Sequence, residues 1–460
     1  MMNISQPLKN ILFEKMHLAK SSSYVLEMTI TQSDADISIT PVEIVSIRIE
    51  QQFISSVMDS IVCSCMFFPG DLLTLLLNSQ DLKTTIIMRR WDRDIYGYYN
   101  SEEPDIYQYN VILANPQDLL KTLPPAVFKK TNISDYDKEV LMTPMSLDMQ
   151  LVDETELNIK RSKINTVLAD TDMESAILYV ANALQIKNTN ISQIDNTKKY
   201  REVIIPQLQD ITTIFEDFQK QYGIFRKGIA RYISNNTLYV FPPFDTDPAR
   251  SEIVNIFKLP QGSVDGGDMY HSLEGEDIYI ASFGETTSTN TSEQHTENVG
   301  NAVAVKQADT SVGCMSTISN DGTITRNELS NLVVQIDTNA TSTKDQVVIN
   351  SGGTTANIFD KLSEITAGQL EHVSLTWIHA KPFLIKPGTK CILHYDDTSD
   401  KDNDDTYTTV PGIVESAVYI LRQHTKNPSI VYRWDATIIT AVVPKKDEST
   451  NVVKQTHSVT

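Results

Sequence analysis

The sequence has little cysteine, with four residues in a chain of 460. So few thiols cannot form a disulfide framework. Cys63 and Cys65 are two positions apart, on one face of an expected strand. Cys314 and Cys391 lie far away from them and from each other in the sequence. We therefore expect buried free thiols, which are typical of a protein made in a reducing cytosol.

Basic residues are also scarce. The chain has 39 Lys and Arg residues against 59 Asp and Glu residues, which gives a formal net charge of −20 at pH 7. Affinity for nucleic acid depends on clustered basic residues, so this balance argues against a phosphate-binding surface. Solubility is the simplest reason for the acidity.

Long apolar runs are missing as well. The most apolar stretch, residues 61–77, is interrupted by Pro69-Gly70-Asp71 and is too short to span a bilayer. Near the N-terminus, Lys9, Glu14 and Lys15 interrupt any apolar core of a signal peptide. We expect a soluble protein without membrane insertion that is not exported by a standard N-terminal signal.

Motifs of enzyme and metal chemistry are not found. There is no CxxC or HExxH motif, and His372, His379 and His394 have no metal-ligand spacing. Glu216 and Asp217 are adjacent on an expected helix, where they cannot flank one scissile bond as paired carboxylates must. We expect these two carboxylates to lie on a solvated helix face, and the histidines to be hydrogen-bonded or exposed.

Phosphate and calcium loops are missing too. The segment GSVDGGD, residues 262–268, lacks the lysine of a P-loop and is expected to be a turn. The acidic loop Asp396–Asp405 lacks the ordered spacing, central glycine and terminal glutamate of an EF-hand. We therefore expect no enzyme, no catalytic residue, no cofactor and no metal site.

Alternating strands are the clearest signal that is present. Near the C-terminus, Val373, Leu375 and Trp377 alternate with polar residues, and strands are expected at 389–395, 412–421 and 430–443 after the turn Lys386-Pro387-Gly388. Four strands at short spacing predict a small barrel or sandwich.

A second group of strands is expected near the N-terminus. The residues that should share one face in each strand are Val45, Ile47 and Ile49, then Ile61, Cys63, Cys65 and Phe67, then Leu82, Thr84, Ile86 and Met88. A short helix is expected in the segment PGDLLTLLLNSQD, residues 69–81, where its leucines seal one end of the barrel. The following loop is rich in aromatic residues, which are favoured at interfaces, although a self-packed hairpin tip explains it equally well. Its candidate interface residues are Trp91, Tyr96, Tyr98 and Tyr99.

The middle of the chain is expected to be helical. Thr171-Asp172-Met173-Glu174 has the pattern of a capping box, with Thr171 as the N-cap of a helix whose apolar face contains Met173, Ile177, Val180 and Leu184. A second amphipathic helix is expected from about Ile211 to Tyr222 and ends at Gly223. The segment Gly223–Phe241 then predicts a hairpin with its turn at Ser234-Asn235-Asn236, which we expect to open the second β module.

These segments resemble a known family. The segments that carry the resemblance are the C-terminal sequences FLIKPGTKCILHYDD (383–397), VPGIVESAVYIL (410–421) and YRWDATIITAVV (432–443), the N-terminal segment 42–91 and the middle segment PQLQDITTIFEDFQKQYGIF (206–225). They resemble baseplate hub proteins of contractile phage tails, which are related to the hub part of type VI secretion spike proteins. The resemblance implies a homotrimer at the centre of the baseplate, in which each subunit contributes two similar barrels. It also implies contacts with the tail tube protein, the central spike protein and baseplate wedge proteins, and assembly into the virion tail in the host cytoplasm. DNA passes through such a hub as cargo and is not specifically bound.

The expected fold is therefore α+β and mainly β, with two small antiparallel β-barrel modules, helical segments between them and an inserted polar excursion. The expected segments are an N-terminal extension (1–40), a first β-barrel module (41–150), a helical module (151–222), a second β-barrel module (223–284 and 370–445), a Ser/Thr/Asn-rich insertion (285–369) and a flexible tail (446–460). Two other functions stay open: an adhesin that binds host-surface glycan, and a tail-associated cell-wall hydrolase.

Overall fold

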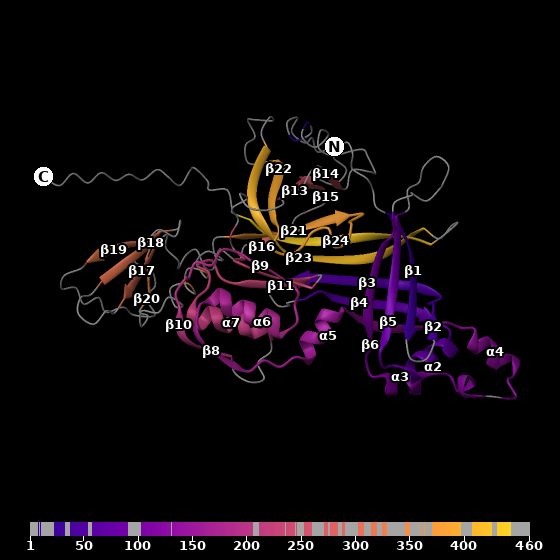
Figure 1. Cartoon of the computed structure of the whole chain (residues 1–460). Coiled ribbons are helices and arrows are strands. Elements are labelled where there is room, and N and C mark those ends of the chain that lie inside the picture. The colour runs from indigo at the N-terminus through magenta and orange to yellow at the C-terminus, as the bar shows by residue number, and fades with distance from the viewer. Residues whose placement is uncertain are drawn as a thin grey trace.

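The structure is a computed structural model of the whole chain. It describes residues 8, 10, 23–32, 37–53, 58–90, 103–129, 131–205, 211–234, 236–243, 245, 253–259, 271–274, 277–283, 288–289, 302–307, 314–319, 324–328, 346–349, 359, 363, 370–396, 407–425 and 430–442. The protein is mainly β, as expected, and most of its described strands belong to one 15-stranded sheet. Figure 1 shows these strands in the upper centre and on the right, with a helical module below them on the left.

One part of the large sheet returns to its starting strand. Antiparallel pairings run in the order β23-β3-β4-β7-β6-β5-β1-β24, and β24 pairs again with β23. We call these eight strands the first ring; their bounds are β1 (Ser23–Gln32), β3 (Glu43–Gln52), β4 (Ser60–Phe67), β5 (Leu82–Arg90), β6 (Asp105–Leu113), β7 (Met145–Val152), β23 (Tyr407–Thr425) and β24 (Val431–Val442). The short strand β2 (Ile37–Ile39) pairs with β1 outside this path.

The other part of the sheet shares two strands with the first ring. We call it the second arc; its order is β14-β15-β13-β22-β23-β24-β21-β16, and β15 also lies against β21. The bounds of its further strands are β13 (Ile253–Leu259), β14 (His271–Glu274), β15 (Asp277–Phe283), β16 (Ser288–Thr289), β21 (Glu371–Ile378) and β22 (Lys390–Asp396). The expected C-terminal strands are thus confirmed as strands, whereas two separate closed barrels stay a prediction.

The strands β23 and β24 are long because each one serves both parts of the sheet. The first half of β23 pairs with β22, and its second half, Ser416–Ile420, pairs with β3. A register shift between Val414 and Ser416 separates the halves, and the extra residue is Glu415. Likewise, β24 pairs with β1 near its start and with β21 along the rest.

The inner side of the large sheet is an apolar core. Of the predicted inward residues, those of β4, β5 and β21 are all buried, and Trp434 packs there with its indole Nε1 3.4 Å from Met88 Sδ. Strand β3 differs from the expectation because its pairing shifts between Ile44 and Ser46. This bulge turns Val45 outward, with 47% of its surface exposed, and Ile44 takes the inward position.

Short helices lie beside the first ring. The expected helix α2 (Pro69–Leu77) follows β4 and buries Leu72, Leu75 and Leu76 in the ring's core cluster. Three further elements lie between β6 and β7: α3 (Pro116–Thr122), the 3₁₀ helix η1 (Pro125–Phe128) and α4 (Asp135–Leu141). Figure 1 shows α3 and α4 at the lower right end of the molecule.

A separate central module has its own core. Its elements are α5 (Glu154–Arg161), β8 (Thr166–Thr171), α6 (Met173–Ala183), β9 (Asn188–Ile191), β10 (Tyr200–Ile205), α7 (Ile211–Tyr222), β11 (Ala230–Ser234) and β12 (Thr237–Phe241). The predicted apolar face of α6 is buried in this core, together with Ile214, Phe215 and Phe218 of α7. Gly223 ends α7 with a positive φ of 72°, as expected.

Two predictions about the central module are corrected. The N-cap of α6 is Asp172, whose carboxylate accepts a hydrogen bond from the Ser175 backbone N–H, because Thr171 is still the last residue of β8. The hairpin β11–β12 forms as predicted, but it does not pair with the C-terminal strands. Instead β12 pairs in parallel with β9, so the hairpin belongs to a three-stranded sheet of the central module.

The polar insertion contains a four-stranded sheet in its described part. Its order is β19-β18-β17-β20, with bounds β17 (Ala302–Gln307), β18 (Cys314–Ser319), β19 (Ile324–Glu328) and β20 (Gln346–Ile349). Figure 1 shows this sheet at the far left, away from the large sheet and the central module. The other expectations for the insertion, the acidic loop beyond Asp396 and the tail 446–460 lie outside the described residues.

Candidate functional site: a polar joint beneath the strands

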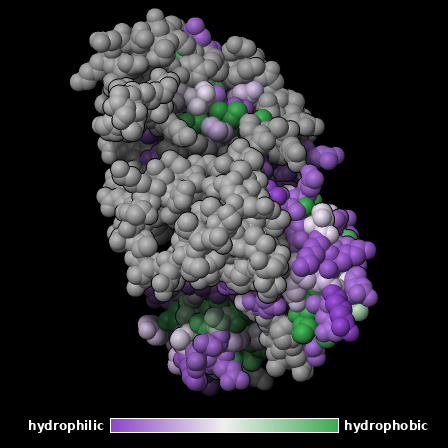
Figure 2. Space-filling view, turned by 90° about the vertical axis from the view of Figure 1, so that its left-hand side faces the viewer, coloured by the Kyte–Doolittle hydropathy of each residue, from purple (hydrophilic) through white to green (hydrophobic). Residues whose placement is uncertain are grey.

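The candidate interface residues of the aromatic loop cannot be placed. Trp91, Tyr96, Tyr98 and Tyr99 all lie outside the described residues. On the face drawn in Figure 2, the described hydrophobic residues stand in small groups among hydrophilic ones.

The hairpin β11–β12 instead marks the most distinctive contact, because it has two buried faces. Ile233, Leu238 and Val240 point into the core of the central module. The alternate residues Tyr232 and Phe241 lie against the strands, as the period of two in a β-strand requires. We call this contact region between the hairpin and the large sheet the joint.

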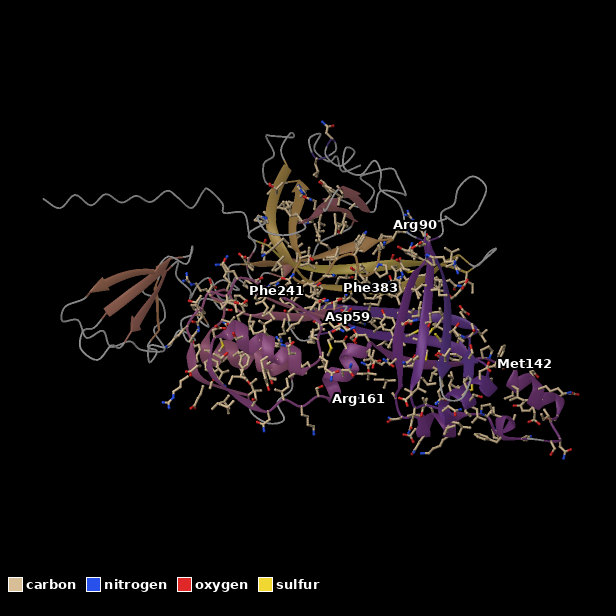
Figure 3. All side chains as sticks on the ribbon, viewed as in Figure 1. Asp59, Arg90, Met142, Arg161, Phe241 and Phe383 are labelled. Atoms are coloured by element: carbon tan, nitrogen blue, oxygen red, sulfur yellow. The ribbon has the colours of Figure 1, made fainter. Side chains whose placement is uncertain are left out.

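The first ring contributes an aromatic contact to the joint. Phe53, which follows β3, packs edge-on against Phe241 with ring centroids 5.4 Å apart. Ala230 and Tyr232 complete this small cluster. The aromatic residues bury much apolar surface, and Figure 3 shows Phe241 where the magenta central module meets the strands above it.

A carboxyl group lies within this apolar contact. The Tyr232 hydroxyl donates a hydrogen bond to Asp59 Oδ1, and Gln51 Nε2 lies 3.0 Å from the same oxygen and 2.9 Å from the Tyr232 hydroxyl. Asp59 comes directly before β4 and Gln51 lies in β3, so the first ring holds both of them against the hairpin. Figure 3 labels Asp59 near the centre of the molecule.

Burial raises the pKa of Asp59 to about 6. The hydrogen bonds from Tyr232 and Gln51 act in the opposite direction, because they favour the charged form, but they do not outweigh burial. The nearby carboxylates of Asp153 and Glu156, at the start of α5, raise the pKa further. Burial also raises the pKa of the Tyr232 hydroxyl.

The second arc contributes the other half of the joint. Phe241 packs against Leu370, Ile413 and Ala441. Gly388, in the predicted Pro-Gly turn, approaches the same ring so closely that an added Cβ would lie 2.3 Å from Phe241 Cζ. This contact and a positive φ of 88° explain why the turn needs glycine.

A histidine–glutamate pair lies on the same face of the second arc. His372 is the cross-strand partner of Ala441, and Ala441 is the partner of Ile413, so the three share the face that Phe241 contacts. His372 Nδ1 is 2.8 Å from Glu415 Oε2. The hydrogen bond to Glu415 raises the pKa of His372 above its ordinary value, while Glu415 is only 3% exposed.

The helix side of the hairpin is also held by an ion pair. Arg231, which is 5% exposed, lies with its guanidinium 2.7 Å from Glu216 of α7. The Glu216 side chain is 39% exposed, so it lies on a partly solvated helix face while it pairs with Arg231. Its carboxylate neutralises a buried cation and ties the hairpin to the helix.

The arrangement of these groups can join the hairpin to the strands. No cluster of three or more His, Cys, Asp or Glu residues that could hold a metal ion occurs among the described residues. His394 lies elsewhere, stacked on Phe257, with its Nε2 3.0 Å from Asn255 Oδ1. Cys63, Cys65 and Cys391 are buried free thiols, as expected. In the described part of the chain, helices long and apolar enough to cross a membrane are not found.

Sequence reasoning missed Asp59, Gln51, Tyr232 and Glu415. One of them had a visible signal, because Glu415 is a charged residue within the apolar strand VPGIVESAVYIL. A charge in such a strand requires a partner or a bulge. Of the other three, Gln51 and Asp59 are eight positions apart, but Tyr232 is 173 positions from Asp59, and nothing in either segment indicates that they meet.

The fold and this joint define a mainly β protein whose helical module is fixed to a large strand assembly through buried polar groups. Residues 13–272 match the model of the family described as bacteriophage PBS1 gene 109 protein. The match covers more than half of the chain, so the protein belongs to this bacteriophage family. A search of curated proteins finds no match.

Several solved structures are similar over most of the chain, at low identity. The Francisella PdpA–VgrG complex in its half-lidded form has a TM-score of 0.40 and 10% identity, and covers 94% of this chain and 60% of that chain. The prophage tail protein gp18 of Listeria monocytogenes EGD-e has a TM-score of 0.37 and 8% identity, over 92% of this chain and 95% of that one. The phage P2 baseplate in its activated conformation with Ca has a TM-score of 0.28 and 7% identity, over 92% of this chain and 100% of that one.

Proposed function

We propose that the protein is a structural component of a phage tail baseplate, namely the hub that joins the hexameric tail tube to the trimeric central spike of a contractile tail. Its membership of a bacteriophage family supports a role in a virion. Its resemblance to baseplate hub proteins involves segments that form the first ring, the second arc and α7.

The observation that carries the proposal is the pair of strands shared by the first ring and the second arc. Because β23 and β24 pair within both parts, one chain holds two strand assemblies rigidly side by side. A hub between a six-fold tube and a three-fold spike requires this: three chains with two tube-like units each present six units to the tube.

In this role the protein acts without chemistry on a substrate. The first ring and the second arc form two barrels of the wall, three chains close around a channel, and DNA passes through without a specific site. The net charge of −20 suits such a wall, since like charges disfavour adsorption of DNA. Its partners are two further copies, the tube protein, the spike protein and the wedge proteins.

Reconstitution tests the proposal directly. The chain is mixed with the tail tube and central spike proteins of the same phage, and the complexes are imaged by electron microscopy. We expect a ring with six β units between tube and spike. A complex in which the chain lies at the periphery or binds neither protein contradicts the hub role.

The two alternative functions have separate tests. Binding of the isolated protein to a glycan array, without binding to the tube or spike proteins, favours the adhesin. Clearing of cell-wall material in a zymogram favours the hydrolase. The hub account predicts neither result.

A further inference from the structure

Two titratable centres lie at the joint or on the sheet face that forms it. Asp59 lies against the first ring, and the His372–Glu415 pair lies on the second arc. Asp59 lies at the contact of the hairpin with the strands, and the His372–Glu415 pair lies on the sheet face whose Ile413 and Ala441 contact Phe241 of the hairpin.

The groups that face Asp59 do not stabilise its negative charge well. The neutral donors Gln51 and Tyr232 reach one of its oxygens. The titratable groups that interact electrostatically with Asp59 are acids and phenols. They are Asp153 and Glu156 at the start of α5, Tyr109 of β6, Tyr232 of β11 and Tyr419 of β23. An ionised Asp59 is thus a half-buried, poorly solvated anion beside other anions, whereas its protonated form is neutral and can stay in the contact.

The second centre has the complementary chemistry. Glu415 is almost fully buried, and its Oε1 has no hydrogen-bond partner in the described part of the molecule. His372 pairs with its Oε2, and its protonated form supplies the opposite charge. Lys390 shares this sheet face as the cross-strand partner of Ile413, and it pairs with Asp245. Loss of the proton from His372 removes the positive charge that is paired with the buried Glu415.

We propose that the joint is an acid-tightened hinge: the central module is seated firmly on the strands when Asp59 and His372 carry their protons, and it loosens as the pH rises and both protons leave. This property is independent of the baseplate role.

At both centres the contribution to the seating of the central module falls as the pH rises. The pKa of Asp59 is about 6 in the joint and 3.8 ordinarily, so its contribution is full below about pH 4 and is lost as the pH rises to about 6. The pKa of His372 is raised from 6.5, so its contribution is full below that value and is lost as the pH rises through the raised value. If opening restores the ordinary pKa of Asp59, the seating equilibrium weakens about tenfold between pH 5 and pH 7 from this residue alone.

Hydrogen exchange measured by mass spectrometry on the full chain tests the hinge. After correction for the intrinsic pH dependence of exchange, we expect protection of residues 230–241 to fall about tenfold or more from pH 5 to pH 7. Protection of β4, in the apolar core of the first ring, should stay constant. Constant protection of the hairpin across this range overturns the proposal.

Three variants identify the groups responsible. Asp59→Asn, which resembles the protonated acid, should remove most of the pH dependence, whereas Asp148→Asn on the exposed face of β7 should leave it unchanged. Tyr232→Phe removes a donor to the carboxylate, so the Asp59 transition should move to higher pH. If both Asp59→Asn and Tyr232→Phe show the pH dependence of the wild-type protein, the assignment to Asp59 is overturned. If Asp59→Asn does not fold, the midpoint pH of the Tyr232→Phe transition tests the assignment alone: an unshifted midpoint overturns it.

Discussion

The core of the first ring and the joint differ in what holds them together. The core contains apolar side chains and buried thiols from strands that alternate regularly, and Trp434 lies among them. The joint also contains aromatic residues, but it combines them with the half-buried carboxyl of Asp59, and the His372–Glu415 pair lies on the sheet face that Phe241 contacts. Apolar packing tolerates many combinations of residues, whereas a buried polar contact depends on each partner. We therefore expect the ring to provide stability and the joint to provide a specific, adjustable connection.

The largest effect should follow from placing a charge in the core. Trp434→Asp removes a side chain whose truncation alone costs about 3–5 kcal/mol and leaves a carboxylate without a partner. Since a domain is stable by about 5–15 kcal/mol, we expect the variant to be insoluble or to show no cooperative thermal unfolding by circular dichroism. Trp434→Phe should fold and melt only moderately earlier. A Trp434→Asp variant that melts like the wild type would show that this face is not a core.

A smaller effect is expected where the second arc touches the hairpin. Gly388→Ala forces a Cβ toward Phe241 and places alanine at a positive φ, so we expect a loss of about 2–3 kcal/mol in chemical denaturation. In a Phe241→Ala background the same substitution should cost only about 1–2 kcal/mol, because the backbone strain remains and the clash does not. Equal losses in both backgrounds contradict the close approach of the turn to the hairpin.

The smallest effect is expected at the ion pair on the helix side. Glu216→Gln keeps the shape of the side chain but removes the charge that faces buried Arg231, and it should cost about 1 kcal/mol. Asp135→Asn is the matched control, because the Lys138–Asp135 pair of α4 is highly exposed and should contribute less than about 0.5 kcal/mol. A cost for Glu216→Gln as small as that of the control means that the pair does not hold the hairpin.

The same comparison explains what the sequence could predict. Alternation in β4, β5 and β21 identified the buried face correctly, because burial on one side of a strand leaves a period of two. In β3 the bulge after Ile44 broke that period, and periodicity alone cannot locate a bulge. The hairpin Gly223–Phe241 was also recognised from its turn, but its sheet was not. Which sheet it joins depends on the parallel partner β9, which is a tertiary contact.

The joint could not be predicted for a related reason. Its hydrogen bonds join residues separated by many positions, such as Gln51 and Tyr232, 181 residues apart. No local sequence pattern indicates that such distant residues are in contact. Only the charge of Glu415 inside an apolar strand gave a local sign of it, because a bulged and buried glutamate needs a partner such as His372.

The central claim is that one chain supplies two tube-like units to a three-fold hub. Multi-angle light scattering on the purified full-length chain tests this claim most directly. If the protein is this hub, we expect a particle of three times the chain mass of 51.6 kDa that stays intact on dilution. A mass equal to one chain at all concentrations, or a stable dimer, contradicts the hub.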